Sequence, residues 1–303
     1  MIINPYKFLS LRHIGNSIEN ISPILYEQFL NIHTSIKDIV YKNAITMKVQ
    51  KYTLFEDIAI ETINRCNGSC SFCPVNRNID PRKFHLLEKE LFFSIINQLS
   101  DINYRGVVTL HCNNEPFLDK RIFEFAEYTR NKLPNVSISL CTNGSLLTPE
   151  KFYKIIPNLN HLIIDNYNDK LRLNKDVESI YEICKSNEEY NKKIWIILRK
   201  ENEILTSRSG KAKNRKNIKL LSSPCIYPFM QLSIRSDGKV NMCCNDALGI
   251  ETLGDTHKET LIDIWNGLRY KEVRQKILLN RNLLNLCKNC DEIVIPIDIR
   301  NII

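Results

Sequence analysis

Short apolar runs alternate with amphipathic segments between residues 57 and 198, and this alternation limits the folds open to the chain. Five runs have the length and composition of strands: 58–63, 107–110, 136–140, 161–164 and 194–198. Helical spacing follows the first four: 91–99, 122–126 after an expected cap at Asp119, a helix opening at 148–150, and 175–190. This order predicts a right-handed parallel sheet, open or rolled into a barrel.

Three cysteines, Cys66, Cys70 and Cys73, occupy the loop after the first expected strand. Ligands of parallel sheets gather at the carboxyl ends of strands, where this loop lies. Spacings of four and three residues let the sulfurs face one point, as ligands of zinc or of an iron–sulfur cluster do. A structural zinc site normally takes a fourth ligand nearby, yet no Cys or His follows before His85. The set therefore leaves one metal position open to a ligand that is not protein.

The composition is that of a globular protein, with 43% hydrophobic and 25% charged residues among 303. Residues 1–7 lack the apolar segment of a signal peptide, and no apolar run reaches the ~18 residues of a membrane span. We therefore expect a cytoplasmic protein with no membrane association. In a reducing compartment the eleven cysteines are more often metal ligands than disulfides.

Two segments flank the alternating region. Ser22 and Pro23 open a helix with apolar residues at helical spacing, so residues 1–50 are expected to be a helical extension that covers one end of the domain. Docking of a partner or peptide is the alternative. Residues 206–224 begin with a polar, basic run and are expected to be a linker; a clamp for an anionic substrate is the alternative.

The pattern becomes antiparallel after Cys225. Residues 232–242 alternate around the Asp237-Gly238 turn, which predicts a hairpin, and a helix is expected over 259–280.

Cysteines gather again in this region. Cys243 and Cys244 close the hairpin, and Cys287 and Cys290 form a C-x2-C pair. With Cys225 they can supply four thiolates, enough to close an iron–sulfur cluster or a zinc site. Neighbouring strand residues point to opposite faces, so only one of Cys243 and Cys244 is expected to be a ligand.

The spacing C-x3-C-x-aromatic-C, with Phe72 as the aromatic residue, resembles the signature of the radical S-adenosylmethionine (SAM) superfamily. The resemblance implies that Cys66, Cys70 and Cys73 hold a [4Fe–4S] cluster whose fourth iron binds the amino and carboxylate groups of SAM. Phe72 is then expected near the cluster and the adenine. The implied fold is α/β, a partial (β/α) TIM-like barrel over 51–205.

Residues 225–303 resemble the SPASM/Twitch extension of these enzymes, a small α+β cluster-binding module. No cysteine follows Cys290, as in the shortened Twitch form, which holds one auxiliary [4Fe–4S] cluster. The implied ligands are Cys225, Cys243, Cys287 and Cys290. This spacing, and a barrel of five strands, resemble those of the 2-deoxy-scyllo-inosamine dehydrogenases.

Further residues at the ends of the expected strands match the family's SAM site. Glu115 and Pro116 match its Gly-Gly-Glu-Pro motif, with Asn113 and Asn114 in place of the glycines. The resemblance implies SAM contacts for Asn114, Glu115, Asn143, Asn166 and Arg199. Turn and rim roles are the alternative for the last three. Arg208 lies in a stretch that resembles one before the Twitch module, which implies substrate binding or proton removal.

The resemblance implies reductive cleavage of SAM and hydrogen abstraction from a small-molecule substrate, most simply to oxidise a sugar- or aminocyclitol-like alcohol. Modification of a ribosomal peptide, and radical decarboxylation or dehydration of a sugar derivative, are alternatives. A flavodoxin- or ferredoxin-type electron donor is the implied partner. A zinc-stabilised protein that binds nucleic acid is the non-enzyme alternative, but it predicts aromatic residues within the basic run, and 206–219 contains none.

Overall fold

A computed structural model describes residues 1–3, 22–49 and 53–293 of the chain. The predicted N-terminal extension and C-terminal module therefore each include residues outside the described part. Within that part, one sheet has nine strands in the order β1-β6-β5-β4-β3-β2-β7-β8-β9. The strands are β1 (Ile2–Ile3), β2 (Asp57–Ile60), β3 (Val107–Thr109), β4 (Ser137–Thr142), β5 (His161–Tyr167), β6 (Ile194–Arg199), β7 (Gln231–Ile234), β8 (Lys239–Asn241) and β9 (Thr252–Asp255).

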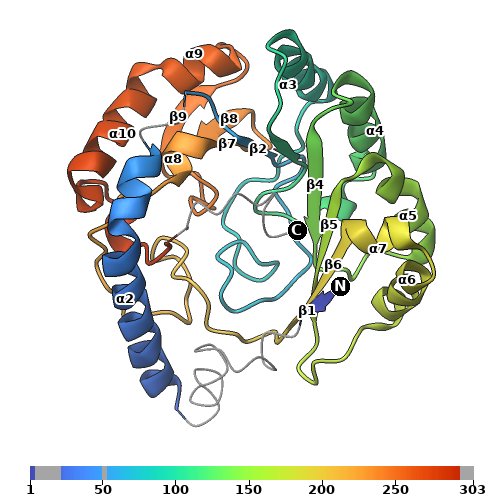
Figure 1. The fold of residues 1–303 in the computed structure, drawn as a ribbon, viewed down its shortest axis with the longest axis horizontal. Helices are drawn as coiled ribbons and strands as arrows, with labels where there is room; N and C mark the ends of the chain where they lie inside the picture. Colours follow the sequence, from blue (N-terminus) through green and yellow to red (C-terminus); the bar gives the residue numbers. More distant parts are fainter. Residues whose placement is uncertain (4–21, 50–52, 294–303) are drawn as a thin grey trace.

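The sheet from β1 to β7 is parallel, and β8 and β9 continue it antiparallel. Figure 1 shows the parallel strands curving around a centre filled by loops, with α3, α4, α5 and α6 on the outer side. Residues in β4, β5 and β6 alternate between buried and half-buried, because one face packs on these helices and the other faces the centre. This is the predicted partial barrel.

The described helices are α2 (Pro23–Val49), α3 (Lys89–Asp101), α4 (Ile122–Lys132), α5 (Pro149–Ile155), α6 (Lys175–Lys185), α7 (Glu188–Lys193), α8 (Tyr227–Met230), α9 (Leu261–Asn266) and α10 (Leu268–Asn280), with 3-10 turns η1 (Pro116–Leu118), η2 (Ile156–Asn158), η3 (Arg281–Leu283) and η4 (Cys287–Asn289). Helices α3, α4, α5 and α6 each bury apolar side chains, whereas α7 buries none. Much of the apolar surface of α2 is exposed, including Ile32 and Val40. The apolar face predicted for 91–99 is buried in α3. Each such Leu, Ile or Phe contributes roughly 1.5–3 kcal/mol by burial.

Three helix predictions need correction. Asp119 does not cap α4, which begins after Arg121; the Asp119 carboxylate instead accepts from the backbone N of Arg121 at 3.0 Å. The helices expected over 175–190 and 259–280 are each divided. Asn187 accepts from the N of Tyr190 at 3.0 Å and so starts α7, while Gly267 separates α9 from α10. Local capping therefore interrupts apolar patterns that look continuous in sequence.

The parallel sheet is longer than the five strands predicted. β1 pairs with β6, and β7 pairs with β2 in parallel, Ile58 opposite Leu232. The two residues of β1 are too few to show a period, and the sequence suggested only the local partner of β7, which is β8. The predicted hairpin is confirmed, but it extends the barrel sheet directly. The boundary proposed at 206–224 therefore does not coincide with a break in the sheet.

The expected linker is packed under α2. Glu27 accepts from the backbone N of Lys216, and Asp38 accepts from the N of both Ser222 and Ser223, each at 2.7–2.8 Å. Arg215 is 2% exposed. The lysines of the basic run are exposed, as expected of a solvated segment, whereas its arginines are drawn into the protein.

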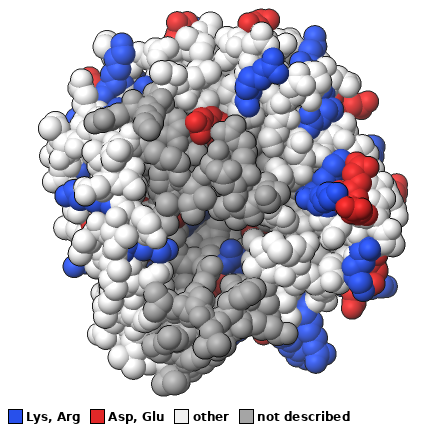
Figure 2. Space-filling model, viewed as in Figure 1, with Lys and Arg blue, Asp and Glu red and all other residues white. Residues whose placement is uncertain are grey.

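No described helix has both the length and the apolar character that a membrane crossing requires. Figure 2 shows Lys and Arg spread around the rim of one face and interleaved with Asp and Glu. On the described atoms of that face, the net charge of +8 is not gathered into the basic stripe that is typical of nucleic-acid binding.

Candidate functional site: a cavity between two groups of thiols

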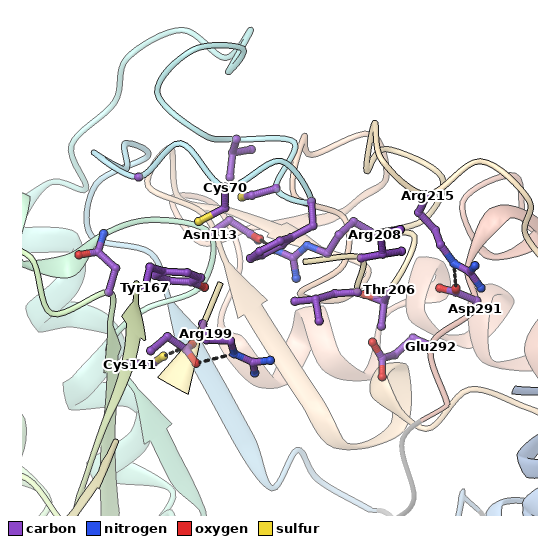
Figure 3. A pocket seen from close by; sticks show the side chains of 18 of the residues that line it. Cys70, Asn113, Cys141, Tyr167, Arg199, Thr206, Arg208, Arg215, Asp291 and Glu292 are labelled. Carbon is purple, nitrogen blue, oxygen red and sulfur yellow. Dashed lines mark hydrogen bonds and ion pairs between the residues drawn. The ribbon is translucent and has the colours of Figure 1, made fainter. Parts of the chain in front are cut away.

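A cavity of about 590 Å³ opens at the carboxyl ends of the parallel strands. Its size lies within the ~300–1,000 Å³ usual for ligand sites. Its walls come from α2, the loops after β2 and β3, the ends of β4, β5 and β6, and residues 204–215 and 291–293. Figure 3 shows side chains from these elements converging on the space.

The three-cysteine loop forms one wall of the cavity. Asn76 shapes this loop by donating to the backbone oxygens of Cys70 and Cys73 at 2.9 and 3.0 Å. A Cβ added at Gly68 would lie 3.4 Å from Sγ of Cys66 and 3.7 Å from Sγ of Cys70, so both sulfurs flank the same small residue. The loop thus brings the thiols of Cys66 and Cys70 to the same small stretch of backbone.

These thiols suit a metal cluster better than nucleophilic catalysis. Burial raises the pKa of Cys66 to about 11 and that of Cys70 to about 12, so both are protonated near neutral pH unless a metal supplies positive charge. Across the described residues, no three His, Cys, Asp or Glu side chains stand close enough to hold one metal ion. A cluster keeps its ligands farther apart than a single ion does, because iron and sulfide lie between them, and it therefore fits the loop.

Glu115 is positioned in the cavity wall by its neighbours. Its carboxylate, 1% exposed, accepts from Oγ1 of Thr142 and the backbone N of Asn143, both at 2.8 Å, and from the N of Phe117 at 3.1 Å. Burial raises the pKa of Glu115, and these donors oppose the rise. Asn114 lies beside it, with Nδ2 buried and unpartnered among the described residues. The predicted Asn114–Glu115 pair therefore lines the cavity and retains one free amide donor.

Asn143 connects the end of β4 to the three-cysteine loop. Its Nδ2 donates to Oδ1 of Asn67 at 2.8 Å and lies 3.9 Å from Sγ of Cys66. Gly144 has φ +74°, and a Cβ there would approach Ile164 and Val177 to within 3 Å, so the turn requires glycine. The predicted residue lies at the site, where it holds the loop.

The prediction for Asn166 is wrong. Its side chain is fully buried and bonds the following loop, donating to the backbone O of Arg172 and accepting from the N of Asn174, both at 2.9 Å. Strand residues alternate in direction, so its neighbours Asp165 and Tyr167 line the cavity instead. The sequence identified the correct strand end but the wrong face.

Arg199 faces the cavity, but two carboxylates already pair with it. Nε lies 3.1 Å from Asp165 and Nη1 lies 3.2 Å from Glu203, while Nη2 donates to no described residue. Phe72, predicted near the cluster, also lines the cavity. The centroid of its ring lies 6.2 Å from that of Tyr167. Phe72 and Tyr167 together form an aromatic wall of the cavity.

Arg208 bridges the barrel mouth and the C-terminal region. Its guanidinium donates to Asn113 at 2.5 Å and to Asn245 at 3.4 Å. The backbone at Arg208, Ser209 and Gly210 has positive φ values of 48°, 55° and 77°, a strained run that turns the side chain inward. Burial lowers the pKa of Arg208, but the nearby thiols and Glu292 outweigh this and raise it.

The C-terminal cysteines form a second, buried group. Cys225, Cys243, Cys287 and Cys290 are 9, 7, 7 and 6% exposed. Cys243 interacts electrostatically with its chain neighbour Cys244 and with the other three members of the group. Cys244 lies among a different set of groups, which includes Cys112, Arg208 and Tyr227. The geometry thus favours Cys243 over Cys244 as the fourth member of the group.

His111 was missed by the sequence analysis. It lines the cavity after β3, and neither ring nitrogen has a hydrogen-bond partner among the described residues; Nδ1 is buried. Burial lowers its pKa to about 4, so the ring is neutral near neutral pH. The sequence offered one signal for this residue: His111 lies two residues before Asn113, at the end of an expected strand, where ligand-binding side chains gather. Cys112 and Cys141 also line this cavity.

Two family models match the chain. Residues 60–203 match the radical SAM superfamily, and residues 225–291 match SPASM, an iron–sulfur cluster-binding domain. The two matches cover most of the chain and coincide with the barrel and with the four-cysteine region. The chain therefore belongs to the radical SAM superfamily and is a radical SAM enzyme. Its cofactors are a [4Fe–4S] cluster bound with SAM and an auxiliary iron–sulfur cluster, which contradicts the zinc-stabilised nucleic-acid-binding alternative.

More specific similarities agree with this assignment. The S-adenosyl-L-methionine-dependent 2-deoxy-scyllo-inosamine dehydrogenase of Niallia circulans is 23% identical over 244 residues, 79% of this chain and 94% of the relative. The crystal structure of BtrN in complex with AdoMet and 2-DOIA matches with a TM-score of 0.70 at 21% identity, covering 82% of this chain and 97% of that one. Streptococcus suis SuiB bound to precursor peptide SuiA matches with a TM-score of 0.51 at 14% identity, covering 81% and 73%. These structures share the fold.

Proposed function

We propose that this enzyme oxidises an alcohol carbon of an aminocyclitol- or sugar-like molecule to a ketone. The cavity of about 590 Å³ carries the proposal, because it extends from the three-cysteine loop to Arg208 and Glu292 beside the four-cysteine region. A substrate held there lies between the two groups of thiols. The relative from Niallia circulans is named as a dehydrogenase of an aminocyclitol.

The residues that we propose to contact SAM line the cavity. Cys66, Cys70 and Cys73 are the proposed ligands of the SAM-binding cluster, and Cys225, Cys243, Cys287 and Cys290 those of the auxiliary cluster. For SAM itself we propose Phe72 against the adenine, Glu115 and Asn114 at the amino group, and the free Nη2 of Arg199 at the carboxylate. Asn143 holds the three-cysteine loop in register with these groups.

When bound at Cys66, Cys70 and Cys73, the cluster and SAM would supply the chemistry that removes one hydrogen atom from the substrate carbon. Arg208 remains a cation and donates hydrogen bonds to a substrate hydroxyl, which favours the binding role over proton removal. His111, neutral and without a hydrogen-bond partner in the described part of the chain, accepts the hydroxyl proton. An auxiliary cluster held by the four C-terminal cysteines would take up the remaining electron, and the C–O bond would become C=O.

Modification of a peptide is the second candidate, since SuiB, which shares the fold, was crystallised with its precursor peptide. Residues Tyr26, Phe29 and Leu30 of α2 line one side of the cavity, which favours a compact substrate.

We also propose a flavodoxin- or ferredoxin-type protein as the electron donor of this enzyme, and a cytoplasmic location. No disulfide joins any of the eleven cysteines, which agrees with a reducing compartment.

The test measures 5′-deoxyadenosine with the reduced, fully loaded enzyme and a panel of aminocyclitols, sugars and short peptides. Substrates deuterated at the carbinol carbon should transfer deuterium to deoxyadenosine and yield a ketone. His111→Gln should retain deuterium transfer but lose ketone formation by roughly 10²-fold or more. Deoxyadenosine stimulated by peptides alone, or formed without deuterium transfer from any alcohol, would overturn the proposal.

A further inference from the structure

Arg281 is buried next to the four-cysteine group without an anionic protein partner. It is the first residue of η3, directly after α10, and is 1% exposed. Nη1 donates to the backbone O of Glu292 at 3.3 Å, and Nε is buried without a partner. Among the described residues, no carboxylate forms an ion pair with Arg281.

The four thiols are the strongest electrostatic neighbours of this guanidinium. The backbone O of Leu284, directly after η3, accepts from the N of Cys287 at 3.0 Å. Nη1 of Arg281 in turn bonds Glu292, two residues after Cys290, so the side chain lies beside the C-x2-C pair. Arg281 also interacts electrostatically with the carboxyl group of Glu292. Arg208 and Lys37 interact with that carboxyl group more strongly than Arg281 does. The charge of Arg281 is therefore directed mainly at the thiols.

A buried guanidinium is unfavourable unless an anion balances it. The neutral thiols of the protein alone do not provide that anion. The cluster that a SPASM-type region binds does, because its thiolate ligands leave the site negatively charged. The unpartnered Nε–H also offers a donor to a cluster or ligand sulfur. The buried charge of Arg281 is thus balanced when the four cysteines hold an anionic cluster, and it is not balanced when they are neutral thiols.

We propose that Arg281 is a positioning cation that balances the charge of the auxiliary cluster and raises its reduction potential. When the substrate radical is oxidised by one electron, the auxiliary cluster is reduced by one and gains one negative charge. A fixed cation beside it stabilises the reduced form more than the oxidised form. The inference depends on the auxiliary cluster and not on the identity of the substrate.

The test is a redox titration of the intact, reconstituted enzyme followed by electron paramagnetic resonance. SAM is added to perturb the signal of the three-cysteine site and so to distinguish it from the auxiliary signal. Arg281→Gln should lower the equilibrium constant for one-electron reduction of the auxiliary cluster at least tenfold, a potential about 59 mV more negative. Arg281→Lys, which keeps the charge, should recover most of the shift.

Arg274→Gln is the matched control. Arg274 lies on α10, stacks on Trp265 at 4.0 Å and has an unpartnered Nη2 among the described residues, yet no thiol influences its pKa. It should leave the potential unchanged.

An unchanged potential in Arg281→Gln with full iron would overturn the proposal. Loss of the auxiliary iron in Arg281→Gln but not in Arg281→Lys would support it, because charge alone separates the two variants. Equal loss in both would overturn it and assign Arg281 to packing. None of these outcomes requires substrate turnover, so the potential remains informative even if no alcohol is oxidised.

Discussion

The two groups of thiols differ in number, burial and surroundings. Cys66, Cys70 and Cys73 are half-buried on the wall of a large cavity, whereas the four C-terminal cysteines are each at most 9% exposed. A single loop supplies the first group. A hairpin end, a segment before β7 and the η4 turn supply the second. An incomplete set beside a cavity can bind an exogenous ligand, while a complete buried set can only store or pass charge.

Removing one ligand from each group tests this difference most directly and should have the largest effect. Cys66→Ala should lose about four of about eight irons and more than ~100-fold of SAM cleavage. Cys243→Ala should lose a similar number of irons but keep SAM cleavage, with substrate oxidation abolished. Iron, sulfide and deoxyadenosine assays on anaerobically reconstituted protein provide the measurements.

Two variants serve as controls for that experiment. Cys244→Ala changes the neighbour of Cys243, and Cys184→Ala changes a buried thiol of α6; both should retain about eight irons. If Cys244→Ala rather than Cys243→Ala lost the auxiliary iron, the ligand assignment would be reversed. If either ligand variant emptied both sites, the two groups would not be independent.

Glu115 should affect only the open site, and its effect should be smaller. Glu115→Gln keeps the size of the side chain and removes the negative charge proposed to bind the SAM ammonium. The expected loss of ~1–2 kcal/mol raises KM for SAM roughly tenfold. The potential of the auxiliary cluster should stay the same. An unchanged KM would show that Glu115 only supports the turn at Thr142 and Asn143.

Asn166 should have the smallest effect on function, although it is adjacent to the cavity-facing Asp165. Asn166→Ala removes two buried hydrogen bonds to the next loop and should lower the free energy of unfolding by ~1–3 kcal/mol. KM for SAM should not change, because the side chain points away from the cavity. Chemical denaturation and initial-rate assays separate these effects. A higher KM without loss of stability would restore the original prediction for Asn166.

Spacing along the chain was enough to predict most of the site's chemistry. The three-cysteine loop, the C-x2-C pair and the Glu115 motif are local patterns, and their positions at strand ends followed from strand–helix alternation. Predictions failed where direction mattered. Whether Asn166 or Asp165 faces the cavity depends on the direction of the pleat at one strand residue. Asp119 does not cap the helix because its carboxylate accepts hydrogen bonds from the backbone N and the Nε of Arg121.

The sequence by itself determined the parallel sheet and the two groups of thiols, because each depends on local period or spacing. The cofactor class followed from the resemblance of these cysteine motifs to a known family. The tertiary structure alone decided which distant residues meet. It placed β7 beside β2, brought His111, Arg208 and Glu292 to one cavity, and buried Arg281 against four cysteines from three separate segments. These contacts join residues far apart in the chain, and such contacts are set by packing and electrostatics in the folded state, which no local pattern encodes.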